Sequence, residues 1–166
     1  MARYNLNMNN LFLLRHAKSS WDNSFLSDHD RPLAKRGIQD SLKLADHLLD
    51  TSFDRIFCSS SKRTLETADL VLSDTHMKHN MHITDDLYHA DINDVLNLLS
   101  TNGDTHENIL LIGHNPTMQY LVEYLTDESL GNFPTCAFAH IKIKTEWCNI
   151  DKRSNSLEKF IRPKEL

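Results

Sequence analysis

LFLLRH, at residues 11–16, joins four consecutive apolar residues to an arginine and a histidine. A short apolar run of this kind predicts a strand that is buried on both faces. The stretches RIFC at Arg55–Cys58 and ILLI at Ile109–Ile112 predict two more strands. We therefore expect Arg15 and His16 to lie at the point where the first buried strand ends.

Helical patterns separate these strands. Between Gly37 and Leu49, apolar residues recur at spacings of three and four, which predicts one buried face of a helix. The residues of this face are Ile38, Leu42, Ala45 and Leu49. The other predicted helices cover Lys62–Leu72, which three serines precede as possible caps, then Val95–Leu99 and Met118–Leu125. The remaining predicted strands are Met81–Thr84, Cys136–Lys144 and Ser156–Ile161.

Strands that alternate with helices in this way predict an α/β fold. We expect a mostly parallel central sheet flanked by helices on both faces. The chain contains no low-complexity linker, charge run or internal repeat that would divide it. We therefore expect residues 1–166 to form a single domain.

Composition excludes several classes of protein. Hydrophobic residues are 40% and charged residues 25% of the chain, which is ordinary globular usage. No apolar stretch reaches the roughly 18 residues that span a bilayer, and the first ten residues do not resemble a secretory signal. The net charge of −5 disfavours nonspecific nucleic-acid binding. Three cysteines without a C-x-x-C motif favour a reduced, cytoplasmic protein rather than a disulfide framework or a structural zinc site.

Phosphate-binding loops rich in glycine are also excluded. The four glycines of the chain are too widely spaced for G-x-G-x-x-G or for a Walker A motif. If the protein binds phosphate, it must do so with side chains. Asn115-Pro116 predicts a helix N-cap with proline in the first turn, and the N–H groups of that helix start would add to an anion site.

Cationic and titratable residues follow the predicted strands at the point where each strand ends. Arg15 and His16 follow the first strand, Arg63 lies one turn into the helix after the second, and His114 follows Ile109–Ile112. Ligands bind beyond the carboxyl ends of strands in open α/β sheets, so we expect these side chains to meet. Two arginines with no acid in the cluster predict a phosphate site.

The two histidines need not have the same role in such a site. A neutral imidazole can attack phosphorus, and nearby arginines lower its pKa and keep it neutral. A second histidine can stabilise the oxygens of the transferred group. The set therefore contains one nucleophile and three stabilising groups.

Four motifs in order resemble the histidine phosphatase superfamily. Along the chain they are LLRHA at residues 13–17, DRPL at residues 30–33 followed by Arg36-Gly37, Ser59 to Arg63 with Thr67, and GHNP at residues 113–116. The DRPL motif with Arg36-Gly37 is similar to that of the small SixA-like phosphohistidine phosphatases. The resemblance runs from about residue 11 to residue 163, which we expect to be the core of a histidine-phosphatase-like domain.

The resemblance implies roles for single residues. It implies that His16 is the phosphate-accepting nucleophile and that Arg15, Arg63 and His114 bind the phosphoryl group. Ser19 lies where some relatives place a hydroxyl near phosphate, although a solvent-facing loop serine explains it equally well. Ala17 stands where the superfamily often has glycine, so a positive φ at Ala17 would be strained. Ser60 stands where proline is common.

A general acid is not evident in the sequence. Asp30 is one candidate, and its structural alternative is an ion pair with Arg31 or Arg36 that holds the loop. The segment Asp85–Asp94 offers four more acids but does not single one out. A P–N bond depends less on such an acid, because a protonated imidazole leaves as a neutral ring.

We therefore expect a phosphatase that hydrolyses phosphohistidine on a protein through a covalent phosphohistidine intermediate, with no metal and no cofactor. The alternatives are a small-molecule phosphomonoesterase of the same superfamily and a noncatalytic phosphate-binding module. The expected partner is a phosphorylated protein or a small phosphorylated substrate, not nucleic acid or a membrane.

His76, His79 and His82 are not predicted to bind metal, since neither a helix nor a strand brings all three to one face. Trp21 and Trp147 are expected to be packing residues, with Trp21 close enough to His16 to line the pocket.

Overall fold

Six strands form one sheet in the order β3-β2-β4-β1-β5-β6. The structure is a computed structural model that describes residues 8–73, 76–150 and 152–166. The strands are β1 (Asn9–Arg15), β2 (Arg55–Ser59), β3 (Met81–Thr84), β4 (Asn108–Gly113), β5 (Phe138–Ile143) and β6 (Ser156–Ile161). The helices are α1 (Lys35–Leu48), α2 (Lys62–Val71), α3 (Ile92–Asn102) and α4 (Thr117–Leu125). The short 3-10 helices are η1 (His76–Asn80), η2 (Asp85–Leu87), η3 (Trp147–Asn149) and η4 (Pro163–Glu165).

The sheet is mixed but mostly parallel, and the predicted α/β class is confirmed. β1 pairs in parallel with β4, which pairs in parallel with β2, and β2 pairs in parallel with β3. β5 and β6 extend the sheet as antiparallel strands on the other side of β1. Because β1, β2 and β4 run in the same direction, their carboxyl ends lie at one edge of the sheet.

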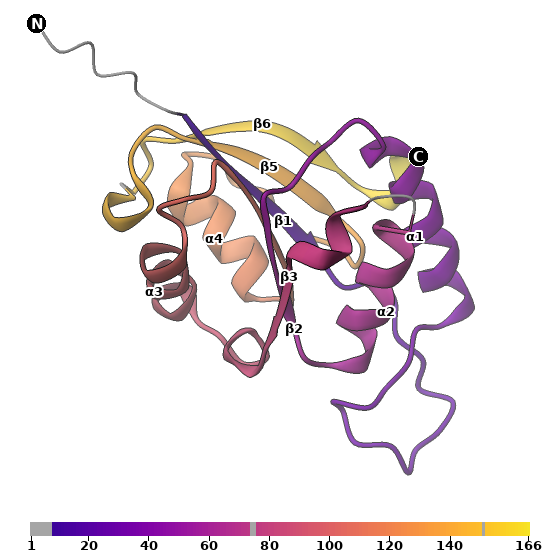
Figure 1. Cartoon of the computed structure of the whole chain (residues 1–166). Helices are drawn as coiled ribbons and strands as arrows, with labels where there is room; N and C mark the ends of the chain where they lie inside the picture. Colours follow the sequence, from indigo (N-terminus) through magenta and orange to yellow (C-terminus); the bar gives the residue numbers. More distant parts are fainter. Residues whose placement is uncertain (1–7, 74–75, 151) are drawn as a thin grey trace, which may run out of the picture.

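Two layers of helices cover the sheet, with α1 and α2 on one face and α3 and α4 on the other (Figure 1). Alternate residues of β1 point into the two layers: Leu11 and Leu13 pack in the α3–α4 layer, and Phe12 and Leu14 pack in the α1–α2 layer. A strand with an apolar layer on each face needs apolar residues at every position. This explains the uninterrupted apolar run at Leu11–Leu14.

The buried face of α1 differs from the predicted one. Ile38, Leu42 and Leu49 are 42%, 48% and 56% exposed, whereas the helix buries Ala45 and the neighbouring stripe Gly37, Ser41, Leu44 and Leu48. The reason is a close approach at Gly37, where a Cβ atom would lie 2.2 Å from the carbonyl oxygen of Lys18. The helix turns its small residues toward the segment that follows His16, and the prediction was wrong because it counted only apolar residues.

Two predicted helix starts also differ in detail. Ser61 is the N-cap of α2, but its hydroxyl meets the Thr64 hydroxyl at 2.8 Å instead of capping a backbone N–H. α4 begins after Pro116, so Asn115 is not its N-cap. The Asn115 amide instead donates to the carbonyl oxygen of Phe133 at 2.9 Å, which joins this turn to the segment before β5.

No helix in residues 8–73, 76–150 and 152–166 is long and apolar enough to cross a membrane.

Candidate active site

The ends of β1, β2 and β4 bring the predicted residues together. Arg15 and Gly113 are partners in the β1–β4 register, and the backbone N–H of His16 donates to the carbonyl oxygen of Gly113 at 3.0 Å. The rings of His16 and His114 lie with their centroids 5.1 Å apart. Arg63 enters the same space as the second residue of α2. The expected meeting of these side chains at one edge of the sheet is confirmed.

The hydrogen bond of His16 fixes which of its ring nitrogens carries a proton. Nδ1 lies 2.7 Å from the carbonyl oxygen of Ala17, in a side chain that is only 8% exposed. A carbonyl oxygen can only accept a hydrogen bond, so Nδ1 must be the donor. In the neutral ring, the lone pair is therefore on Nε2.

Burial keeps both histidine rings neutral near pH 7. Burial, helped by the charges of Arg63, Arg15 and Arg31, lowers the pKa of His16 to about 4 against the opposing effect of its hydrogen bond to Ala17. Burial is also the main cause that lowers the pKa of His114 to about 3, followed by the effects of His16 and Arg63. A neutral His16 has the form that a nucleophile requires.

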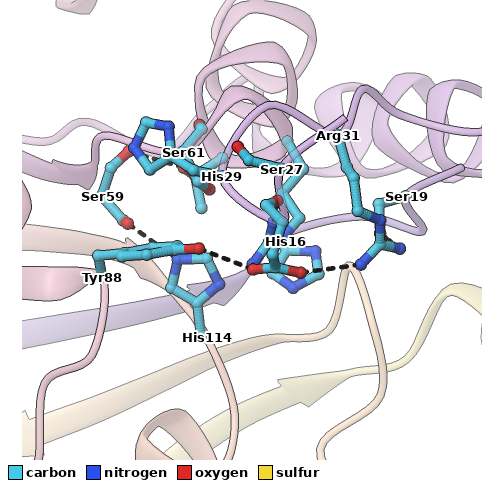
Figure 2. A network of polar contacts seen from close by, with 12 residues as sticks. His16, Ser19, Ser27, His29, Arg31, Ser59, Ser61, Tyr88 and His114 are labelled. Atoms are coloured by element: carbon cyan, nitrogen blue, oxygen red, sulfur yellow. Dashed lines mark hydrogen bonds and ion pairs between the residues drawn. The ribbon is translucent and has the colours of Figure 1, made fainter. Parts of the chain in front are cut away.

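His114 is held from two directions. Its Nε2 lies 2.8 Å from the hydroxyl of Ser59, the last residue of β2. The ring of Tyr88 stands edge-on to His114 with centroids 5.5 Å apart. Figure 2 shows Tyr88 and Arg31 on either side of His16, with His114 beneath Tyr88. Tyr88 was not predicted, because no motif in the sequence marks it.

Arg15 has a buried guanidinium nitrogen without a partner among the described residues. Its Nη1 donates to the carbonyl oxygen of Phe133 at 2.8 Å, while its Nε is buried and has no hydrogen bond within the described residues. Asn115 donates to the same carbonyl group and leaves its own Oδ1 buried and unpaired. Buried polar groups without partners are rare in native proteins, and a free N–H of Arg15 suits an anionic oxygen.

The expectation that the cluster contains no acid was wrong. Arg63 donates from Nη2 to Oδ2 of Asp28 at 2.9 Å, and its Nη1 donates to the backbone carbonyl of the same residue. The hydroxyl of Tyr88 donates to the same carboxylate oxygen at 2.7 Å. This hydroxyl is the main cause that holds the pKa of Asp28 well below its usual range, with Arg63 and Arg31 contributing. Asp28 was not predicted because two of its three partners, Arg63 and Tyr88, are 35 and 60 residues away along the chain.

Arg31 is a third arginine of the site and is buried like Arg63, although the sequence suggested for it only an ion pair with Asp30. Its guanidinium donates to Oδ1 of Asp28 at 3.0 Å and to the Ser19 hydroxyl at 2.7 Å. Ser19 is therefore a buried residue, 7% exposed, and not a solvent-facing loop serine. Trp21 is not a core residue: it is 72% exposed, and the Arg31 guanidinium carbon lies 3.2 Å from its ring centroid. Trp147 is buried as expected.

Four of the predicted acid candidates are held by other partners. The side chain of Asp30 is 63% exposed and is held by the Ser27 hydroxyl and by His29, not by Arg31 or Arg36. Arg36 instead pairs with Asp40. Asp85 accepts a hydrogen bond from Ser60. Asp91 and Asp94 form the capping box of α3.

The segment after His16 needs no glycine at position 17. Ala17 is not among the described residues with positive φ, so its Cβ is accommodated without cost. The backbone N–H of Ala17 donates to Thr67 in α2.

His79 and His82 are exposed, and the side chain of His76 lies outside the described residues. Within the described part of the chain, no three potential metal ligands gather in one place.

A cleft of about 520 Å³ opens beside His114. Its walls come from the segment that joins β3 to α3 and from the start of α4. They include Tyr88, His89, Ile92, His114, Asn115 and Tyr120. The cleft therefore continues from the cluster of cationic and imidazole side chains.

Comparison with known proteins agrees with this geometry. A family model described as the histidine phosphatase superfamily (branch 1) matches residues 11–102, more than half of the chain. The chain belongs to this superfamily. SixA from Agrobacterium tumefaciens has the same fold with a TM-score of 0.80 and 26% sequence identity, over 93% of this chain and 98% of that one.

Two further solved structures show the range of this fold. The protein histidine phosphatase SixA, solved with tungstate, superimposes with a TM-score of 0.80 at 24% identity, over 94% of this chain and 98% of that one. The α-ribazole phosphatase of Shigella flexneri superimposes with a TM-score of 0.70 at 20% identity, over 93% of this chain and 96% of that one. The superfamily and these neighbours are phosphatases, and they differ in the substrates that their names give.

Proposed function

We propose that this protein hydrolyses phosphohistidine on a protein substrate through a covalent phosphate on His16. The observation that carries the proposal is the hydrogen bond from His16 Nδ1 to Ala17, which leaves the Nε2 lone pair free beside buried arginines. The overall similarity to SixA proteins favours phosphohistidine as the substrate.

In the first step, Nε2 of His16 attacks phosphorus and the P–N bond of the substrate breaks. The bonding electrons leave with the departing imidazole. The His16 ring becomes a cation that keeps its Nδ1 proton, and the Ala17 carbonyl stabilises this cation. In the second step, water attacks the phosphorus of phospho-His16, loses a proton to solvent and releases inorganic phosphate. His16 then regains its lone pair on Nε2.

Arg15, Arg63 and His114 bind the oxygens of the phosphoryl group in this proposal. Arg15 offers its unpaired Nε, and Arg63 and Arg31 add positive charge. Guanidinium groups stay charged at any working pH and bind phosphate oxygens in pairs. They supply the positive charge that a metal ion provides in other phosphatases. We therefore propose that activity persists after exhaustive chelation, and a loss that only Mg²⁺, Mn²⁺ or Zn²⁺ restores would overturn this part.

The test of the function is trapping of the intermediate. Quenched wild-type protein should carry an acid-labile, base-stable phosphate, and His16→Ala should lack both this phosphate and turnover. His47→Ala, which removes an exposed histidine of α1, is the matched control and should behave as wild type. Turnover by folded His16→Ala would overturn the proposal. Binding of tungstate without turnover by wild type would favour the noncatalytic module.

A small-molecule phosphomonoesterase is the second candidate function, and the cleft beside His114 favours it. The cleft has the volume of a small-ligand site and aromatic walls at Tyr88 and Tyr120. An α-ribazole phosphatase shares the fold. Turnover of a panel of small phosphate esters that exceeds turnover of phosphohistidine protein would favour this function.

A further inference from the structure

Asp28 is an acidic side chain inside a site that should attract anions. Its carboxylate is 54% exposed, whereas the arginines that bind it, Arg31 and Arg63, are almost completely buried. The carboxylate therefore lies on the open side of the cluster. A substrate that enters from solvent must pass close to it.

The contacts of Asp28 leave room for one more hydrogen-bond donor. Oδ2 accepts from Arg63 and from Tyr88, and Oδ1 accepts from Arg31. A carboxylate has about four lone-pair positions, so among the described residues Oδ1 keeps one free. The carboxylate stays ionised because a hydroxyl and two guanidinium groups donate hydrogen bonds to it. It can therefore accept a further hydrogen bond from an N–H group of a ligand, but it has no proton to donate as an acid.

Charged and titratable groups face this carboxylate from several elements. They are Arg31 in its own segment, Arg63 in α2, Tyr88 after η2, and His114 at the end of β4. The two arginines give the surroundings a positive charge that the carboxylate only partly cancels. A phosphoryl group can still bind, while a cationic group attached to it gains from the carboxylate.

Phosphohistidine carries such a group. When the ring nitrogen away from phosphorus is protonated, the ring is a cation with an N–H donor. It then leaves as a neutral imidazole. When that nitrogen has lost its proton, the ring must leave as an anion, which is far less favourable. Phosphate esters have no N–H at the corresponding place, and a carboxylate beside their phosphate only repels it.

We infer that Asp28 selects phosphohistidine over phosphate esters by accepting a hydrogen bond from the protonated ring of the substrate. The inference rests on the proposed function. In the step that it assists, Nε2 of His16 bonds to phosphorus, the P–N bond breaks, and its electron pair stays on the departing ring. The proton on the other ring nitrogen stays there, hydrogen-bonded to Asp28, so the product is neutral imidazole and no proton crosses to the enzyme.

Asp28→Asn tests the inference, because asparagine keeps the shape and one acceptor oxygen but loses the charge. The probes are free phosphohistidine and para-nitrophenyl phosphate. The negative charge of Asp28 should raise the pKa of the cationic phosphohistidine ring by about one unit. In Asp28→Asn, the ratio of kcat/KM for phosphohistidine to kcat/KM for para-nitrophenyl phosphate should therefore fall about tenfold or more. Both substrates should be cleaved more slowly because Asp28 also holds Arg63, but the loss of kcat/KM should be about tenfold greater for phosphohistidine than for the ester. Asp22→Asn removes an exposed carboxylate of the same segment and should leave the ratio unchanged.

A pH profile separates this role from simple support of Arg63. The rate of phosphoenzyme formation at saturating phosphohistidine should fall at high pH as the bound ring loses its proton, and this fall should move about one pH unit lower in Asp28→Asn. The inference would be overturned if Asp28→Asn lowered kcat/KM equally for both substrates and the fall in rate at high pH occurred at the same pH as in wild type. Tungstate binding and circular dichroism confirm that the variant is folded. If wild type cleaves no phosphohistidine at all, the proposed function itself fails, which is a distinct result.

Discussion

Thr67 in α2 accepts a hydrogen bond from the backbone N–H of Ala17, with 2.9 Å between the nitrogen and Oγ1. The same hydroxyl donates to the carbonyl oxygen of Arg63 at 2.6 Å, one turn earlier in the helix. Since Ala17 also accepts the hydrogen bond from His16, Thr67 links the proposed nucleophile to the helix that carries the proposed clamp. We therefore expect His16 and Arg63 to keep fixed positions relative to each other.

Thr67→Val should therefore impair both stability and turnover. Valine has the shape of threonine but leaves the buried N–H of Ala17 without an acceptor, which costs about 1–3 kcal/mol of the free energy of unfolding. kcat should fall because the Ala17 carbonyl no longer fixes the His16 ring. Urea unfolding and steady-state kinetics measure the two effects. Thr67→Ser restores the hydroxyl and should recover most of both, and wild-type kinetics in Thr67→Val would contradict the link.

Arg63→Lys should weaken phosphate binding although it keeps the charge. Both terminal nitrogens of Arg63 are held by Asp28, which aims the planar group into the site, and lysine offers a single nitrogen. We expect turnover to fall by about tenfold or more, at about 1.4 kcal/mol per decade, with weaker tungstate or vanadate binding. Arg36→Lys, at an exposed arginine paired with Asp40, is the control. Near-native kinetics in Arg63→Lys would place the clamp elsewhere.

The sequence predicts the frame of the site because the frame follows from local patterns. Uninterrupted apolar runs mark β1 and β4, and parallel strands bring the residues that follow them to one edge. This places Arg15, His16 and His114 without knowledge of any distant contact. The burial of α1 is less predictable, because two stripes of that helix have helical spacing and only the approach of Lys18 to Gly37 decides between them.

Asp28, Arg31 and Tyr88 could not be placed in the same way. They lie in irregular segments, after β1 and after β3, where no periodicity indicates the direction of a side chain. Their network is made of contacts between distant parts of the chain, such as Tyr88 with Asp28. The DRPL motif contains Arg31 and was a usable signal, but the acid that binds it precedes the motif.

Acidification should destabilise the protein before its carboxylates are protonated. The pKa values of His16 and His114 are lowered to about 4 and about 3 from an ordinary value of 6.5. Between about pH 6.5 and pH 4 the unfolded chain binds these protons and the folded chain does not. The free energy of unfolding should therefore fall as pH is lowered through this window, by up to about 1.4 kcal/mol per pH unit for each histidine.

Urea unfolding of His16→Gln at several pH values measures this contribution. The variant cannot bind the proton in either state, so its stability should depend less steeply on pH than that of wild type between pH 6.5 and pH 4. His47→Gln removes an exposed histidine and should leave the slope unchanged. An equal slope in His16→Gln and wild type would mean that His16 titrates alike in both states.

The dependence of the rate on the leaving group should be steep, because the described site holds no side chain suited to protonate an alkoxide. Asp28 is held ionised, and burial together with its hydrogen bond to Asp28 raises the pKa of Tyr88. Asp30 lies outside, bound to Ser27 and His29. Phosphohistidine and activated aryl phosphates should therefore be cleaved well, while phosphoserine and glycerol phosphate should be poor substrates.

A series of aryl and alkyl phosphates at fixed pH tests this dependence through kcat/KM. We expect Asp30→Asn to give the same steep dependence as wild type, because its carboxylate does not reach the site. A flat dependence in wild type would reveal an acid in the reaction. If Asp30→Asn then made the dependence steep, Asp30 would be that acid, its segment would have to close over the bound phosphate, and the phosphomonoesterase would become the better-supported function.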